Sequence, residues 1–152
     1  MIDPASVGKR GEPFTMAVEW GKIREFAQAT GSTNPVYESG ECIPPTFLTS
    51  DRYWHTEASN IQSAVKLDPQ RALQAEQDFV FHGPPPGAGT LLTAQVRVDR
   101  TYEKQGSRGT LTFVELVTEY RDETGRLVAE GRMTGVETPP PAATSAPSGE
   151  TP

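Results

Sequence analysis

The segment Gly31-Ser-Thr-Asn-Pro-Val-Tyr37 is the most informative stretch for chemistry in this sequence, and it is rich in residues that form turns. The hydroxyl groups of Ser32 and Tyr37 stand on either side of a turn at Asn34 and Pro35. Serine has no useful basicity near pH 7, and the tyrosine hydroxyl has an unperturbed pKa of about 10. Taken alone, the segment therefore predicts a helix end followed by a turn.

Six further side chains have chemical types that enzymes use: His55, His82, Cys42, Glu38, Glu41 and Asp51. The two histidines are predicted to be non-catalytic, because neither is expected to pair at helical spacing with the other or with a carboxylate. The cysteine is predicted to be a small, half-buried residue, and the three acidic residues predict a solvated face. The sequence contains no phosphate loop, no His-Glu-x-x-His motif and no nucleophile elbow, and Gly87-Ala-Gly89 lacks the third glycine of a dinucleotide loop.

Two helices are expected in the first half of the chain. Apolar residues at helical spacing predict a helix over residues 20–30 that ends at Gly31, and residues 14–18 alternate like a short strand before it. Pro45 suits a first helical turn, because its missing N–H would have no partner inside the helix. We therefore expect a second helix that opens at Pro44-Pro45, while the polar residues 55–71 leave open whether helix continues to Val65.

Strands follow in the second half, over residues 77–81, 91–103, 110–120 and 127–136. In the second of them Leu92, Ala94, Val96 and Val98 are expected to share the buried face. The last three strands are joined by short turns and predict an antiparallel meander. Helices before strands indicate an α+β fold with a helix laid on a sheet, and the long sheet edges favour a dimer.

Composition narrows the function classes. The 152 residues carry a net charge of −6, and one cysteine, Cys42, excludes an internal disulfide and a cysteine-rich zinc site. No apolar run approaches the roughly 20 residues of a membrane span, no signal peptide is recognisable, and no basic patch suggests nucleic acid. We expect a cytoplasmic protein with no metal and no cofactor, built as one domain over residues 1–138 with a disordered, proline-rich tail over residues 139–152.

The segments 22–37, 43–48 and 75–92, taken in this order, resemble the MaoC-like acyl dehydratases, which include R-specific enoyl-CoA hydratases. Within them the chain is most similar to the non-catalytic N-terminal-type, FAS1-like dehydratase domain, which also forms the accessory subunit of hydroxyacyl dehydratase heterodimers. The resemblance covers about residues 8 to 138. It implies a hotdog fold, in which an antiparallel sheet wraps a central helix that begins at the Pro44-Pro45 segment.

Catalytic members of this family carry an Asp and a His five positions apart, in a Gly-Asp-x-Asn-Pro-x-His pattern. In this chain the Asp position is Ser32 and the His position is Tyr37, while Asn34 and Pro35 retain the turn. The acid–base pair is therefore missing. Backbone N–H groups near Pro45, Thr46 and Phe47 at the expected helix start could still hold a thioester carbonyl, with Tyr37 as a further substrate-binding residue.

Three functions remain open. In the first, the chain is a non-catalytic or weakly active subunit that pairs with a catalytic MaoC-like chain and shapes a tunnel for an acyl-CoA or acyl-ACP thioester. In the second, it is a self-dimerising hydratase or thioesterase that uses relocated groups among Tyr37, Glu38, Glu41, Asp51 and His82. In the third, it is an acyl-thioester binding module. Neither nucleic acid nor a membrane is expected as a partner.

Overall fold

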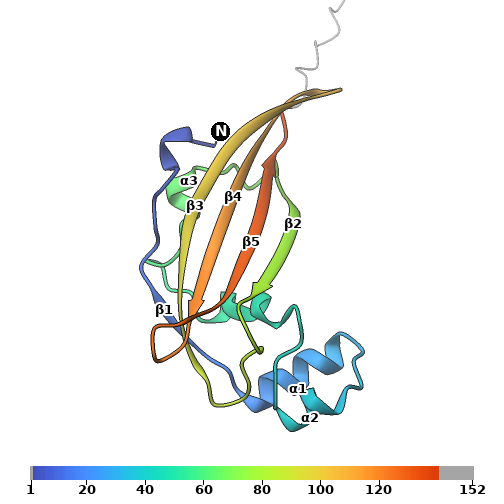
Figure 1. Ribbon diagram of the computed structural model, residues 1–152. Coiled ribbons are helices and arrows are strands. Elements are labelled where there is room, and N and C mark those ends of the chain that lie inside the picture. Colours follow the sequence, from blue (N-terminus) through green and yellow to red (C-terminus); the bar gives the residue numbers. More distant parts are fainter. Residues whose placement is uncertain (1, 141–152) are drawn as a thin grey trace, which may run out of the picture.

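Five antiparallel strands form one curved sheet in the order β1-β3-β4-β5-β2 (Figure 1). A computed structural model describes residues 2–140, without the side chains of residues 62 and 63. The helices are η1 (Pro4–Ser6), α1 (Trp20–Ala29), α2 (Pro35–Ser39), η2 (Phe47–Tyr53) and α3 (Gln62–Val65), where η denotes a 3₁₀ helix. The strands are β1 (Phe14–Ala17), β2 (Ala72–Phe81), β3 (Leu91–Gly106), β4 (Gly109–Arg121) and β5 (Leu127–Glu137). The predicted α+β class is confirmed.

The predicted meander is present as β3, β4 and β5, which pair with their neighbours along nearly their whole length. The alternation expected for β3 is confirmed, since Leu92, Ala94, Val96 and Val98 are all buried on the face that packs against the helices. Residues 8–11 run beside the same strand, where the N–H groups of Gly8 and Gly11 donate to the carbonyls of Val98 and Val96.

The edge strand β2 is longer than predicted, because it begins at Ala72 and not at residue 77. Its first half has no apolar alternation and is almost entirely exposed, so the sequence pattern carried no strand signal there. Pairing with the end of β5 holds it in the sheet, with a bulge between Gln74 and Glu76. Its other edge faces no strand among residues 2–140.

The second helix expected at Pro44-Pro45 is short, and it does not continue without a break to Val65. The structure has the seven-residue η2, an irregular segment and the four-residue α3. The side chains of Thr56 and Ser59 explain the interruption, since the Ser59 hydroxyl accepts from the Thr56 N–H at 2.8 Å and donates to the Thr56 carbonyl at 3.0 Å. Such local bonds compete with the helical pattern.

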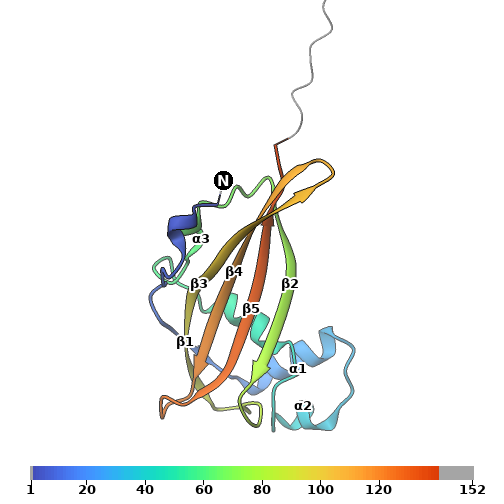
Figure 2. The ribbon, with the colours of Figure 1, turned by 45° about the horizontal axis from the view of Figure 1, so that its top comes forward.

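Helices α1 and α2 lie together beyond one end of the sheet, while η2 lies against its concave face (Figures 1 and 2). The indole N–H of Trp20 donates to the carbonyl of Glu38 at 2.9 Å, and the Arg24 guanidinium pairs with the Glu38 carboxylate at 2.7 Å. These contacts dock α2 on α1.

No helix within residues 2–140 is long and apolar enough to cross a membrane. Of the predicted tail, residues 139–152, all but the first two lie outside the described residues.

Gly87 is expected to be essential for the contact between the turn before β3 and the segment after α2. Its backbone lies so close to this segment that a Cβ atom would come within 2.4 Å of the Glu41 carbonyl oxygen. Gly87→Ala should therefore lower the free energy of unfolding by about 1–3 kcal/mol, measured by urea denaturation. Gly21→Ala is the matched control, since a Cβ at this α1 position meets nothing within 4 Å. It should leave stability unchanged or raise it by up to about 1 kcal/mol, and equal losses in the two variants would contradict the packing argument.

Candidate functional site

A cavity of about 530 Å³ opens between η2 and the concave face of the sheet. Its walls come from η2, from the segment after it and from the four strands β2 to β5. The apolar lining residues are Leu48, Ile61, Phe79, Val96, Leu116 and Met133. The polar lining residues are Thr49, Asp51, Arg52, His55, Asn60, Gln74, Gln77, Thr118 and Tyr120. The sheet therefore contributes apolar and polar side chains in about equal number, whereas η2 and the segment after it form a mainly polar wall.

Asp51 is the centre of the polar wall. The buried hydroxyl of Tyr120, on β4, donates to its Oδ2 atom at 2.6 Å, and the His55 Nε2 atom lies 3.7 Å from the same oxygen. The Asp51 side chain is only 15 % exposed. Among the described residues no donor reaches its second oxygen, Oδ1. One carboxylate oxygen is thus engaged, and the other is left to accept a hydrogen bond from a ligand.

Burial raises the pKa of Tyr120 well above its usual value of 10, and the neighbouring Asp51 carboxylate raises it further. The phenol therefore remains protonated and acts as a hydrogen-bond donor to Asp51. His55 is positioned from its other side by Phe14, whose ring centroid lies 4.3 Å from that of the imidazole. The three polar side chains come from η2, its following segment and β4, and the fold alone brings them together.

The predicted turn at Asn34 and Pro35 is present as the start of α2. The Asn34 side chain accepts from the Val36 N–H at 3.2 Å, and Pro35 occupies the first helical turn. Ser32 lines a small separate hollow of about 220 Å³ beside α1 and α2, whose lining does not include Tyr37. The Tyr37 ring packs against the core instead. Ser32 and Tyr37 therefore do not share one hollow.

The residues predicted to hold a thioester carbonyl have little free backbone to offer. Proline has no N–H, so Pro45 cannot donate. The N–H of Phe47 donates to the Pro44 carbonyl at 3.0 Å, and the Phe47 side chain is fully buried. Thr46 is exposed and precedes η2. The carbonyl site at these residues remains a prediction, in which Thr46 is the candidate donor.

Two sequence-based expectations about single residues need correction. Asp51 does not belong to a solvated face, and His55 pairs with a carboxylate four positions before it. That spacing was visible in the sequence, but Tyr120 could be found only by tracing which side of β4 faces the helices. Burial raises the pKa of the half-buried Cys42 thiol, and the charge of Glu41 adds to this effect, so the thiol is not activated.

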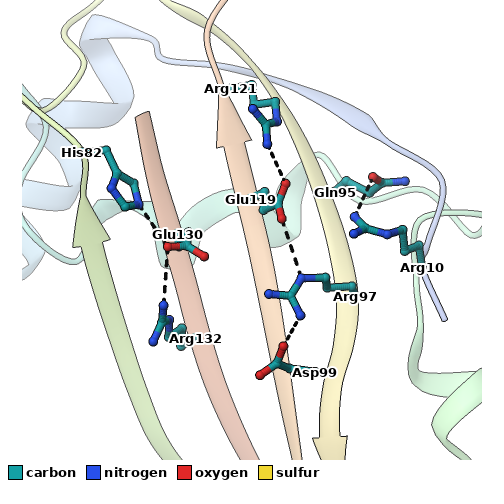
Figure 3. A network of polar contacts seen from close by, with 9 residues as sticks. All are labelled: Arg10, His82, Gln95, Arg97, Asp99, Glu119, Arg121, Glu130 and Arg132. Atoms are coloured by element: carbon teal, nitrogen blue, oxygen red, sulfur yellow. Dashed lines mark hydrogen bonds and ion pairs between the residues drawn. The ribbon is translucent and has the colours of Figure 1, made fainter. Parts of the chain in front are cut away.

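His82 lies on the opposite, outer face of the sheet, within a row of charged side chains (Figure 3). Its Nε2 atom is 3.0 Å from the Glu130 carboxylate on the neighbouring strand β5, a pairing that the local sequence pattern does not reveal. Glu130 stands directly opposite Glu119 in the strand register, and two like charges in that position repel. Four basic side chains offset this repulsion: Arg97, Arg121, Arg132 and His82.

The hydrogen bond from Arg121 is the main reason that the pKa of Glu119 lies below its usual range, and the hydrogen bond with Asp99 is the main reason that the pKa of Arg97 is raised. This network balances its charges internally and has no access to the cavity. Within residues 2–140 no three His, Cys, Asp or Glu side chains come close enough to hold a metal ion.

Comparisons with known proteins agree with this architecture. The profile of the FAS1-like, dehydratase domain region matches residues 5–131. UPF0336 proteins of Streptomyces griseus and Streptomyces coelicolor are 34 % and 32 % identical over 139 residues, which cover 84 % of this chain and 89 % of theirs. A chain of the HadBC (3R-hydroxyacyl-ACP dehydratase) complex of Mycobacterium tuberculosis is 25 % identical with a TM-score of 0.71, over 86 % of this chain and 96 % of that one.

A chain of the ChsH1-ChsH2 complex of the same organism is 15 % identical and shares the fold, with a TM-score of 0.67 over 95 % of this chain and 92 % of that one. These similarities to dehydratase structures confirm the predicted hotdog fold, although the helix inside the sheet is the short 3₁₀ helix η2.

Tyr120→Phe should lower the free energy of unfolding by about 1–3 kcal/mol at pH 7, because it removes a hydrogen bond to a charged group. The difference from the wild type should shrink above about pH 10: there the unfolded chain ionises this tyrosine while the folded chain, with its raised pKa, does not, so the wild type loses stability. Urea denaturation between pH 7 and pH 11 measures both effects. Tyr53→Phe, at a side chain that is 75 % exposed, is the control and should change neither. If the stability difference between Tyr120→Phe and the wild type did not change with pH, the raised pKa of Tyr120 would be contradicted.

Proposed function

Since this chain belongs to the family of FAS1-like dehydratase domains, we propose that it is the non-catalytic partner subunit of a MaoC-like enoyl-thioester hydratase or 3-hydroxyacyl-thioester dehydratase. One observation carries the proposal. The chain keeps the Asn34-Pro35 turn, as the ordered cap of α2, but has Ser32 and Tyr37 where catalytic members have an acid–base pair. A framework without its reactive groups fits a subunit that supports chemistry performed by another chain.

The chemistry of the reaction explains why these replacements matter. Hydration of a 2-enoyl thioester needs a base to activate water, an acid for the other carbon and donors for the thioester oxygen. Ser32 cannot act as a base near neutral pH, and the ring of Tyr37 packs against the core. Each acid–base contribution is worth about 10²–10⁴ in rate, so the loss of both leaves little activity in this segment.

The open edge of β2 supports pairing with a second chain. Within residues 2–140 the ten-residue strand β2 pairs with β5 alone, whereas the opposite edge is formed by the four-residue β1 and by residues 8–11. Leu73 and Val80, on β2, are 61 % and 37 % exposed. An open edge strand of this length is a template for another strand, and a partner sheet would satisfy its free backbone groups.

The cavity supports an acyl-binding role. Its volume of about 530 Å³ lies within the roughly 300–1,000 Å³ of typical ligand pockets, and each of the four strands in its wall contributes one large apolar side chain. The HadBC and ChsH1-ChsH2 structures are complexes by name, the first of them a 3R-hydroxyacyl-ACP dehydratase. By analogy we propose an acyl-CoA or acyl-ACP thioester as the ligand and the cytoplasm as the compartment.

A second candidate is a self-dimerising hydratase or thioesterase that acts without another chain. The pair of Asp51 and His55 favours it, because a carboxylate and an imidazole lie 3.7 Å apart in the lining of one ligand-sized cavity. Of the five residues first considered for relocated chemistry, Asp51 alone lines this cavity. This candidate requires activity from the isolated chain, which the first proposal does not.

The two candidates separate in a hydratase assay with crotonyl-CoA and with a bulky enoyl-CoA. We expect the purified chain to be at least about 10³-fold slower than its co-expressed complex with a catalytic MaoC-like chain from the same source, because the chain lacks both acid–base groups. Within the complex, Tyr37→Phe should leave the rate within about twofold. Activity of the isolated chain that is lost in Tyr37→Phe or Asp51→Asn would instead establish the stand-alone enzyme.

Association through β2 is testable by adding charge to its exposed apolar positions. Leu73→Lys and Val80→Lys should each weaken the complex at least about tenfold in Kd, because a lysine on an edge strand opposes the approach of another strand. Surface plasmon resonance with the immobilised catalytic chain measures this change. Leu91→Lys is the control, since Leu91 is 43 % exposed at the start of β3, which pairs with β1 and lies away from β2. Equal weakening by all three variants would rule out β2 as the interface.

A further inference from the structure

We infer that the cavity beside η2 selects an acyl group that carries a hydroxyl on its tail, beyond the carbons that react. This inference rests on the proposed acyl-binding role of the chain and adds to it the class of acyl group. The cavity lining places the carboxylate of Asp51 close to large apolar side chains. The replacement of the acid–base pair does not account for this arrangement.

The apolar side chains of the cavity can bind the hydrocarbon part of such a ligand. Phe79, Val96, Leu116 and Met133 project from four neighbouring strands into the cavity, and Leu48 and Ile61 add apolar surface from the other side. A chain of methylene groups in contact with these side chains is removed from water, at about 0.8 kcal/mol for each buried CH₂. These six apolar side chains by themselves would accept any alkyl chain.

The polar wall makes an unsubstituted alkyl chain a poor occupant. Asp51 lies in this wall with a side chain that is only 15 % exposed, and no described residue donates to its Oδ1 atom. An alkyl chain that filled the cavity would remove the remaining water from this oxygen and give no hydrogen bond in return, which is costly for a charged group. A ligand that carries a donor at this point avoids the cost.

The geometry around Asp51 also selects the kind of polar group. An ionised carboxylate only accepts hydrogen bonds, so it favours a hydroxyl over a ketone. The Tyr120 hydroxyl holds Oδ2 at 2.6 Å and thereby fixes the orientation of the carboxylate before any ligand arrives. His55, 3.7 Å from the same oxygen, adds a polar group beside it. A preorganised acceptor of this kind discriminates more strongly than a mobile side chain would.

The test compares three ligands of equal carbon number with the purified full-length chain. Isothermal titration calorimetry is performed with dodecanoyl-CoA, its 11-hydroxy derivative and its 11-oxo derivative, and with free CoA to measure the contribution of the head group. We expect the hydroxy derivative to bind at least about tenfold more tightly than either of the other two, as for a hydrogen bond to a charged group. This comparison uses the wild-type chain alone, so it does not depend on the folding of any variant.

Asp51→Asn then identifies the group responsible. The amide oxygen can still accept from Tyr120, but an NH₂ group replaces the free oxygen, so the preference for the hydroxy over the oxo derivative should fall at least about tenfold or reverse. Asp78→Asn, which removes the same charge from an exposed position on β2, is the matched control and should keep the wild-type preference. Thermal melting verifies that each variant is folded.

The outcomes distinguish the inference from the proposed function. If dodecanoyl-CoA binds no better than free CoA and neither derivative binds better, the acyl-binding role itself is wrong and the inference falls with it. If dodecanoyl-CoA binds but the hydroxy derivative gains nothing, the acyl-binding role stands and the selectivity is wrong. Retention of the hydroxyl preference by Asp51→Asn would show that Asp51 is not the acceptor.

Discussion

A curved sheet must have its concave face covered, and in this chain the helix available for the purpose is much shorter than the strands. β3 has sixteen residues and spans about 50 Å, whereas the seven residues of η2 span about 14 Å. The N-terminal segment and α3 cover part of the remainder, with Ile2 and Val65 buried in the core. The part of the concave face that no helix covers forms the cavity. The shortness of η2 thus creates the space in which a ligand could bind.

The same constraint determines where polar groups can lie. On the outer face, carboxylates and guanidinium groups alternate across three strands and neutralise one another, which leaves them structural (Figure 3). On the concave face there is no such balance around Asp51, which has Tyr120 and His55 as its close partners. A carboxylate that is 15 % exposed and has no described donor on one oxygen is costly to bury, and a suitable ligand would relieve this cost. The candidate ligand-binding site therefore lies on the concave face of the sheet, where η2 leaves part of the surface uncovered.

Local patterns predicted the elements whose burial follows a simple period. The alternation in β3 and the helical spacing in α1 both appear as expected, because each element has one buried and one exposed face. The first half of β2 was missed since its side chains are exposed on both faces and only the pairing with β5 makes it a strand. The second helix does not continue from η2 to Val65, because the side chains of Thr56 and Ser59 bond locally to the backbone and compete with the helical pattern.

The sequence by itself determined the fold class and the family, because these depend on residue types in a fixed order. Ser32 and Tyr37 on either side of Asn34-Pro35 are likewise readable without coordinates. The tertiary structure alone decided where polar chemistry remains. Asp51 and Tyr120 are 69 positions apart, and their 2.6 Å hydrogen bond exists only because β4 passes under η2. Spacing along a chain determines which side chains share a helix or strand face, but contacts between distant segments depend on how the whole sheet curves and on what is left to cover it.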